Sequence, residues 1–237
     1  MLNIIKNEFI KSRKINVLLI TNILIMASVF LIYFTMNKFG GEGFLRSSEV
    51  LNMFFASTIS IIPYLIVILI SKSITEEFNN GGMQIYLINP ITRSEILIGK
   101  IAFILINITI TMITQILISF IFSGIFIQVP TLEIAINTIC RYLVTIIPII
   151  GLICILFVPA LIINTSRNSI SFGFAIIAIG PIITSIYTNI KPYSILWIIK
   201  NIENYGENLF INITISIVYI LIGYIFSSYI FNYRDIR

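Results

Sequence analysis

The chain has 237 residues, of which 58% are hydrophobic and 11% are charged, and it carries a formal net charge of +5. A soluble domain has about a quarter charged residues, so this composition excludes a water-soluble globule. The mean hydropathy is +1.03, and the apolar runs reach the roughly 20 residues of helix that cross a bilayer. We therefore predict an all-α integral membrane protein.

Six membrane-spanning helices are predicted, and 1–237 is expected to form a single transmembrane domain. If the N-terminus lies inside, ten Lys and Arg residues face the cytoplasm and five face the other side. This asymmetry predicts that both termini are cytoplasmic. It also accounts for the net charge, so nucleic acid is not expected as a partner. The predicted spans are 15–36, 50–71, 101–127, 136–163, 170–188 and 209–231.

The segment 1–14, before the first span, combines apolar and basic residues. Leu2, Ile5 and Phe9 recur at helical spacing, and Lys6 and Lys11 lie elsewhere on the same helix. This pattern favours a short interfacial helix in the headgroup plane, with its basic side toward the lipid phosphates. An ordinary positively charged flank is the alternative interpretation.

The longest predicted cytoplasmic connection is 72–100. Capping-box patterns occur at 73–76 and 92–95, and each indicates the start of a helix. Between them, the stretch 79–82 contains Gly81 and Gly82 and predicts a break, because glycine adopts a positive φ at little steric cost. We expect a short helix from Ser73, a turn, and a helix from Thr92 that continues into the third span.

The outer connection 189–208, between the last two spans, has an apolar middle. This part is too short to cross the membrane and too apolar to remain in water. Tyr193 and Trp197 suit the depth of the membrane interface. We predict a short helix or a re-entrant pair at the outer face.

The sequence lacks the residues from which membrane enzymes and proton pumps are built. It has no histidine, and no Asp, Glu, Lys or Arg is placed at the middle of a predicted span. It has no G-x-x-x-x-G-K-[ST] phosphate loop, and no H-E-x-x-H or G-x-S-x-G motif. The chain is therefore not expected to be an enzyme, to hydrolyse ATP alone, or to bind its own cofactor or metal.

Polar side chains lie on three of the predicted spans. In the third span they recur at i, i+4, i+7, i+8 and i+12, so they share one helix face. Buried polar side chains join helices in lipid, and this interpretation is favoured over the lining of a transport pathway. The candidate pathway residues are Ser57, Thr58, Ser60, Asn107, Thr111, Gln115, Thr184 and Ser185.

The stretch 76–100 resembles the cytoplasmic loop of type-2 ABC exporter permeases, the membrane subunits of ATP-driven exporters. Gly82-Met83 departs from the Gly-Thr of many members. Before the first span, Glu8, Lys11 and Arg13 are similar to the family's interfacial elbow helix, and the six spans match its layout. The loop residues that match the family pattern are Glu77-Phe78, Gly81-Gly82, Pro90, Thr92-Arg93 and Lys100.

The resemblance implies that two such chains pair, and that each loop docks on a separate ATPase subunit that holds ATP and Mg. It implies that the polar faces of the second and fifth spans border the pathway. The compact size is similar to that of small bacterial permeases for bacteriocin or lantibiotic immunity and for peptide or drug export. The implied coupling residues are Glu76, Glu77, Phe78, Pro90 and Arg93.

Two other functions stay open from the sequence. The chain could be a membrane scaffold or regulatory subunit that transports nothing, in which case the polar faces only join helices. A channel or secondary transporter is disfavoured, because the predicted spans carry no charge at mid-depth.

Overall fold

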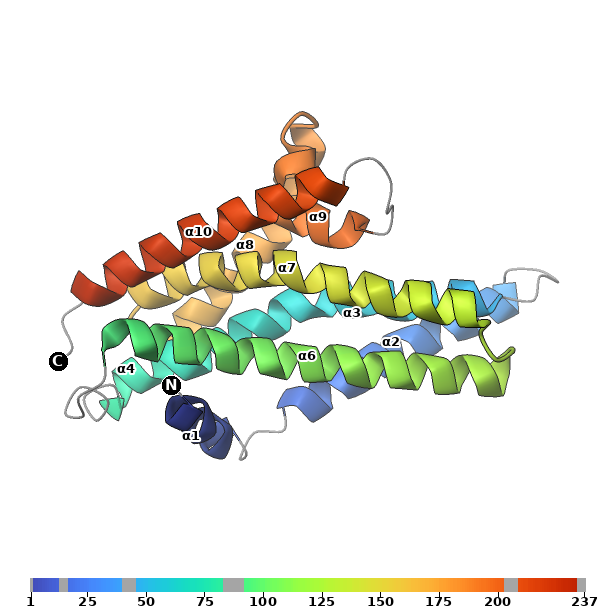
Figure 1. Ribbon diagram of the computed structural model, residues 1–237, viewed down its shortest axis with the longest axis horizontal. Coiled ribbons are helices and arrows are strands. Elements are labelled where there is room, and N and C mark those ends of the chain that lie inside the picture. The colour runs from blue at the N-terminus through green and yellow to red at the C-terminus, as the bar shows by residue number, and fades with distance from the viewer. Residues whose placement is uncertain (1, 13–16, 40–45, 83–91, 203–208, 234–237) are drawn as a thin grey trace.

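The protein is a bundle of long helices (Figure 1). The computed structural model describes residues 2–12, 17–39, 46–82, 92–202 and 209–233, and within these ranges there is no strand. Six helices in the described ranges are long and apolar enough to cross a membrane, which confirms the predicted fold class. They are α2 (Val17–Phe39), α3 (Ser47–Ile70), α6 (Arg93–Phe126), α7 (Leu132–Ile162), α8 (Ser166–Ile186) and α10 (Leu209–Tyr233).

The third long helix, α6, begins well before the predicted span because its capping box is formed. Thr92 accepts a hydrogen bond from the Glu95 backbone N–H, and the Thr92 N–H donates to Glu95 Oε2 at 3.0 Å. The predicted helix start at Thr92 is thus confirmed. With 34 residues, α6 is about 50 Å long, which exceeds the hydrocarbon thickness of about 30 Å.

The other capping-box prediction, a helix that starts at Ser73, is wrong. The helix α3 continues through a π-helical turn, η1 (Ser71–Thr75), into α4 (Glu76–Asn79). Because the chain is already helical at Ser71, no new helix end is available there for Ser73 to cap. The predicted break is confirmed, since the helical run ends at Asn79 and Gly81 follows with φ of 69°.

Helix α1 (Leu2–Ser12) packs against the first turns of α6, at the same end of the bundle as α4 and the last turn of α10 (Figure 1). The contact is close, since a Cβ on Gly99 would lie 2.9 Å from Ile4 Cγ2. The Phe9 and Phe103 rings meet edge to face, with centroids 5.0 Å apart. We call this end of the bundle the α1–α4 end. The opposite end holds the first turns of α3 and α7.

The connection between α8 and α10 contains a 3-10 turn, η2 (Lys191–Tyr193), and a short helix, α9 (Ile195–Asn201). Residues 203–208 of this predicted segment lie outside the described ranges. Helix α9 packs against the middle of α7, because a Cβ on Gly151 would lie 3.0 Å from Ile195 Cδ1. It therefore lies beside the middle of α7 rather than beyond the end of that helix (Figure 1).

Helices α7 and α10 pack closely enough that small residues are required between them. A Cβ on Gly223 would lie 2.8 Å from both the carbonyl carbon and the Cβ of Cys154. One helical turn further on, the Ser227 hydroxyl donates to the Cys154 carbonyl at 3.1 Å. Small residues allow membrane helices to approach in this way, and any added atom must separate the backbones.

We expect Gly223→Ala to separate α7 from α10 and to destabilise the protein by about 1–3 kcal/mol, the range for overpacked sites. Gly124→Ala is the matched control, because a Cβ there would meet only Val129 Cγ2, at 3.9 Å. Thermal unfolding of both variants in one detergent checks the expectation. Equal unfolding temperatures for the two variants would contradict it.

Candidate functional site

A cluster of buried charges joins three segments at the α1–α4 end of the bundle. Lys100 Nζ, on α6, donates to Glu8 Oε1 at 2.8 Å and to Glu77 Oε2 at 2.6 Å. It also donates to the Ser73 carbonyl at 2.5 Å. Lys11 Nζ, on α1, donates to the other oxygen of Glu77 at 2.6 Å. The ionic cluster, as we call Glu8, Lys11, Glu77 and Lys100, therefore connects α1, α4 and α6.

The ionic cluster balances two carboxylates against two ammonium groups. The Lys100 side chain is 1% exposed and that of Glu8 is 4% exposed, so both charges are withdrawn from water. Burial raises the pKa of Glu8, and the positive charge of Lys100 opposes that rise. Such pairs add little net stability, because desolvation offsets their attraction, but each member becomes costly to remove alone. The cluster thus fixes the relative positions of its three segments.

Helix α4 also presents an exposed surface. Glu76, Asn79 and Asn80 are exposed, whereas Glu77 faces the ionic cluster. Any partner that contacts the exposed residues acts on a helix that Glu77 fastens to α1 and α6. The exposed surface of α4 is thus connected through Glu77 to α1 and to the first turns of α6.

The π-helical turn η1 connects this end of the bundle to the junction of α7 and α8. The Ser71 hydroxyl donates to the Ser166 carbonyl at 2.9 Å, at the start of α8. The Thr75 hydroxyl donates to the Ala160 carbonyl at 3.2 Å, in the last turn of α7. Local π-helical turns are frequently found at functional sites. Movement at η1 would thus reach both helices through these two contacts.

Arg93 holds the end of α10. Its Nη1 donates to the Phe231 carbonyl at 2.7 Å and to the Asn232 carbonyl at 2.8 Å. The last carbonyl groups of a helix have no partner within the helix, and a cation there also interacts favourably with the helix dipole. Phe78 supports the same contact, with its ring centroid 6.1 Å from that of Phe231.

We expect Arg93→Ala to lower stability by about 2 kcal/mol, because α10 loses two charge-assisted hydrogen bonds. Arg93→Lys should fall between the wild type and Arg93→Ala, since one ammonium group replaces the planar fork. Arg167→Ala, at an exposed position on α8, is the matched control. Thermal unfolding in detergent gives the readout. Unchanged stability in Arg93→Ala would show that the contact with α10 contributes little.

The predicted coupling residues thus differ in their surroundings. Glu76 is exposed, Glu77 is buried in the ionic cluster, Phe78 packs near Phe231, and Arg93 binds the end of α10. Pro90 lies outside the described residues. Whether any of them touches an ATPase stays a prediction.

The partners of Glu77 were not recognised from the sequence. The available signal was a glutamate among apolar residues in 1–14 and a lysine at the start of the third span. Each of these two charged residues would need a partner of opposite charge if it were buried.

Most of the predicted pathway residues on α3 and α6 are buried and bonded within the bundle. Gln115 Nε2 donates to Asn22 Oδ1 at 2.7 Å, which joins α6 to α2. Thr58 donates to the Phe54 carbonyl and lies 3.5 Å from the Tyr142 hydroxyl on α7. Asn107 and Thr111 are buried and donate to the backbone of their own helix. The contacts of Gln115 and Thr58 favour the joining of helices over the lining of a pathway, whereas the bonds of Asn107 and Thr111 stay within α6.

The remaining predicted pathway residues are more accessible. Ser60 and Ser185 are exposed, and Ser57 and Thr184 are half-buried. The hydroxyls of Ser60, Thr184 and Ser185 donate to carbonyls of their own helices. A hydroxyl that donates to its own helix keeps its lone pairs for another donor.

Among the described residues, no group of three or more His, Cys, Asp or Glu side chains could hold a metal ion. No curated protein matches the chain. Residues 4–191 match the model of a family described as ABC-2 family transporter protein. This match covers well over half of the chain.

Proposed function

The chain belongs to the ABC-2 transporter family and is a membrane subunit of an ABC transporter, and we propose that it exports an amphipathic or hydrophobic substrate. Members of this family work with an ATPase subunit. In this proposal the partner holds ATP and Mg²⁺, and the α1–α4 end of the bundle faces the cytoplasm. The substrate is a peptide, an antimicrobial compound or a drug, and the membrane is the plasma membrane of a bacterium.

The observation that supports the proposal best is the ionic cluster beneath an exposed surface on α4. The ATPase subunit contacts Glu76 and Asn79, and closure of the ATPase pushes α4. Because Glu77 is bonded to both Lys11 and Lys100, α1 and α6 move with it. The contacts of η1 carry the same movement to α7 and α8.

Two copies of the chain, or this chain and a sister chain, form the complete translocation unit in the proposal. The polar groups of α3 and α8 that remain accessible, such as Ser60 and Ser185, border the pathway between the copies. The buried polar groups of α6 keep each copy rigid. A scaffold or regulatory subunit is the second candidate, because the contacts of Gln115 and Thr58 join neighbouring helices.

The proposal is tested by purification of the chain from its native membrane in a mild detergent. A subunit with a G-x-x-x-x-G-K-[ST] phosphate loop should copurify, and amphipathic peptides should stimulate ATP hydrolysis by the complex. If the ATPase copurifies but no substrate alters its activity or moves in vesicles, the scaffold function is favoured. If no ATPase accompanies well-folded protein in several detergents, the proposal fails.

A further inference from the structure

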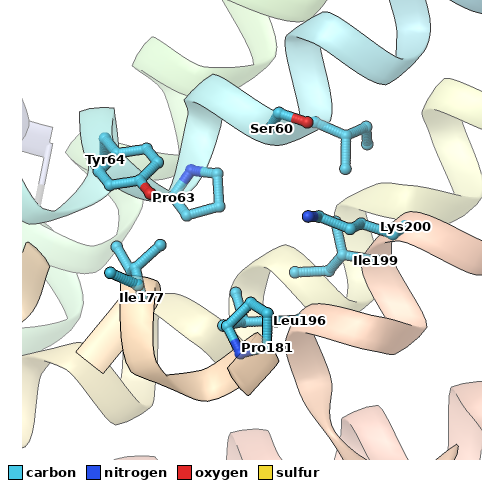
Figure 2. Close-up of a pocket in the computed structure, with 10 residues that line it drawn as sticks. Ser60, Pro63, Tyr64, Ile177, Pro181, Leu196, Ile199 and Lys200 are labelled. Carbon is cyan, nitrogen blue, oxygen red and sulfur yellow. The ribbon is translucent and has the colours of Figure 1, made fainter. Parts of the chain in front are cut away.

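A cavity of about 120 Å³ lies between α3, α8 and α9, apart from the ionic cluster. Figure 2 shows its walls, which combine apolar and polar side chains and come from three separate parts of the chain. Two of the lining residues are prolines, which give this part of α3 and α8 a fixed shape. The principal lining residues are Pro63, Tyr64, Ile177, Pro181, Leu196 and Lys200.

The cavity lies along the membrane-spanning length of the bundle. Pro63 and Tyr64 are well inside α3, which runs from Ser47 to Ile70. Helix α9 reaches this level because it packs against the middle of α7, at Gly151. Two of the three helices around the cavity, α3 and α8, are long and apolar enough to cross a membrane, and the third, α9, is a short helix packed against them.

The amine of Lys200 points into this cavity, as Figure 2 shows. No ion pair or hydrogen bond joins Lys200 to another described residue. The acidic residues nearest in the sequence, Glu203 and Glu207, lie outside the described ranges. Ser60 and Tyr64 add two hydroxyl groups to the lining. Lys200 is exposed, so its ammonium group is accessible at the cavity, and an anionic group bound there can form a charge-assisted hydrogen bond with it.

We propose that this cavity binds an amphiphile with one anionic group on a hydrocarbon chain. The carboxylate or phosphate pairs with Lys200, and the first part of the chain lies between Tyr64, Ile177 and Leu196. The volume resembles that of the roughly 150 Å³ cavity that admits benzene, so only a short part of the chain fits inside. The rest runs along the exposed face of α8, where Ile182 is 58% and Ile186 68% exposed.

Binding at this site does not depend on the export proposed above. If that proposal holds, the bound amphiphile would be a substrate for export. The same chemistry occurs in free monoacyl anions and in anionic membrane lipids. The test can separate these sources and needs no ATPase, so its failure would leave the export proposal standing.

Trp197 provides the measurement, because it is the only tryptophan of the chain and lies one turn before Lys200 on α9. Purified protein in an uncharged maltoside detergent is titrated with a brominated dodecanoate, and quenching of the fluorescence reports binding. The methyl ester of the same compound has the same chain without the charge. We expect the ester to bind at least about tenfold more weakly, the loss of one charge-assisted hydrogen bond.

Variants of Lys200 test the residue itself. Lys200→Gln should weaken binding of the brominated dodecanoate about tenfold or more, and Lys200→Arg should retain it. Lys191→Gln, at an exposed position on η2, is the matched control and should bind as the wild type does. Equal binding of acid and ester to the wild type would overturn the proposal. Unchanged affinity in well-folded Lys200→Gln would overturn it as well.

The source of the ligand follows from nanodiscs that contain brominated phosphatidylglycerol or brominated phosphatidylcholine. Quenching by phosphatidylglycerol that is lost in Lys200→Gln would assign the cavity to an anionic membrane lipid. Quenching by the monoacyl anion alone, again lost in Lys200→Gln, would assign it to a free amphiphile. The site would be refuted if both lipids quenched the fluorescence of the wild type and of Lys200→Gln equally, and the monoacyl anion caused no quenching.

Discussion

Lys100→Met should destabilise the protein by about 3–5 kcal/mol, the largest effect that we expect from a single substitution. Lys100 Nζ is bonded to Glu8, Glu77 and the Ser73 carbonyl, and its side chain is 1% exposed. Without it, two carboxylates remain in a buried site with only Lys11 nearby. Thermal unfolding in detergent should show a much lower transition temperature than for the wild type.

Lys72→Met is the matched control for this expectation. Lys72 lies in η1 at the same end of the bundle and is half-buried. Lys72 takes no part in the hydrogen bonds and ion pairs of the ionic cluster, so the substitution should alter stability by less than about 1 kcal/mol. Comparable losses in Lys72→Met and Lys100→Met would show that the effect of Lys100→Met reflects lost lysine packing rather than the ionic cluster.

A combined substitution should recover much of the loss in Lys100→Met. Lys100→Met with Glu8→Gln and Glu77→Gln removes the uncompensated charges together, and replacement of a whole buried ion network is often nearly neutral. Mild acid should also lessen the defect of Lys100→Met. Burial already raises the pKa of Glu8, and the loss of Lys100 removes an effect that lowers it. Protonation of Glu8 then removes one buried charge as the pH falls.

Glu76→Arg should abolish most of the binding between the chain and its ATPase subunit without destabilising the chain. Glu76 is exposed on α4, so the substitution reverses a surface charge and disturbs no buried contact. Reversal of a charge within a docked interface costs several kcal/mol, which corresponds to a loss of binding of about a hundredfold or more. Copurification of the ATPase with each variant provides the measurement.

Glu133→Arg is the control for Glu76→Arg. Glu133 is exposed in the first turn of α7, at the opposite end of the bundle, and receives the same change in charge. It should leave ATPase binding unchanged. Loss of binding in Glu133→Arg but not in Glu76→Arg would place the docking surface at the wrong end of the bundle for the proposed mechanism.

Glu77 is unsuitable for a test of docking, although it stands next to Glu76 in the sequence. Its carboxylate is bonded to Lys11 and Lys100, so any substitution there also disrupts the ionic cluster. Arg93 has the same difficulty, because it holds the end of α10. The exposed residues Glu76, Asn79 and Asn80 are the positions at which docking can be altered separately from folding.

Local signals in the sequence were sufficient for the helices and for two of the loop features. The apolar runs predicted six spans because a helix in lipid must satisfy its own backbone and present apolar side chains. The capping box at Thr92 and the glycine at Gly81 depend only on neighbouring residues, and both predictions are confirmed. The same logic failed at Ser73, because capping requires a helix end and the π-helical turn leaves none there.

The ionic cluster could not be predicted because it depends on tertiary packing. Glu8 and Lys100 are 92 positions apart, and Glu77 and Lys100 are 23 apart. Nothing local distinguishes the buried Glu77 from the exposed Glu76. The cavity at Lys200 has the same origin, because it forms only when α9 folds back between α3 and α8.

The central claim is that an ATPase subunit docks on the exposed surface of α4, and site-specific photocrosslinking tests it most directly. A photoreactive amino acid is placed at Asn79, which is exposed in α4, or at Glu133 in the same chain as the control. In irradiated membranes we expect an adduct when the photoreactive residue is at Asn79 and none when it is at Glu133. The partner in the adduct should be a subunit that carries a phosphate-binding loop. An adduct from Glu133 alone, or none from Asn79 in an intact ATPase complex, would contradict the claim.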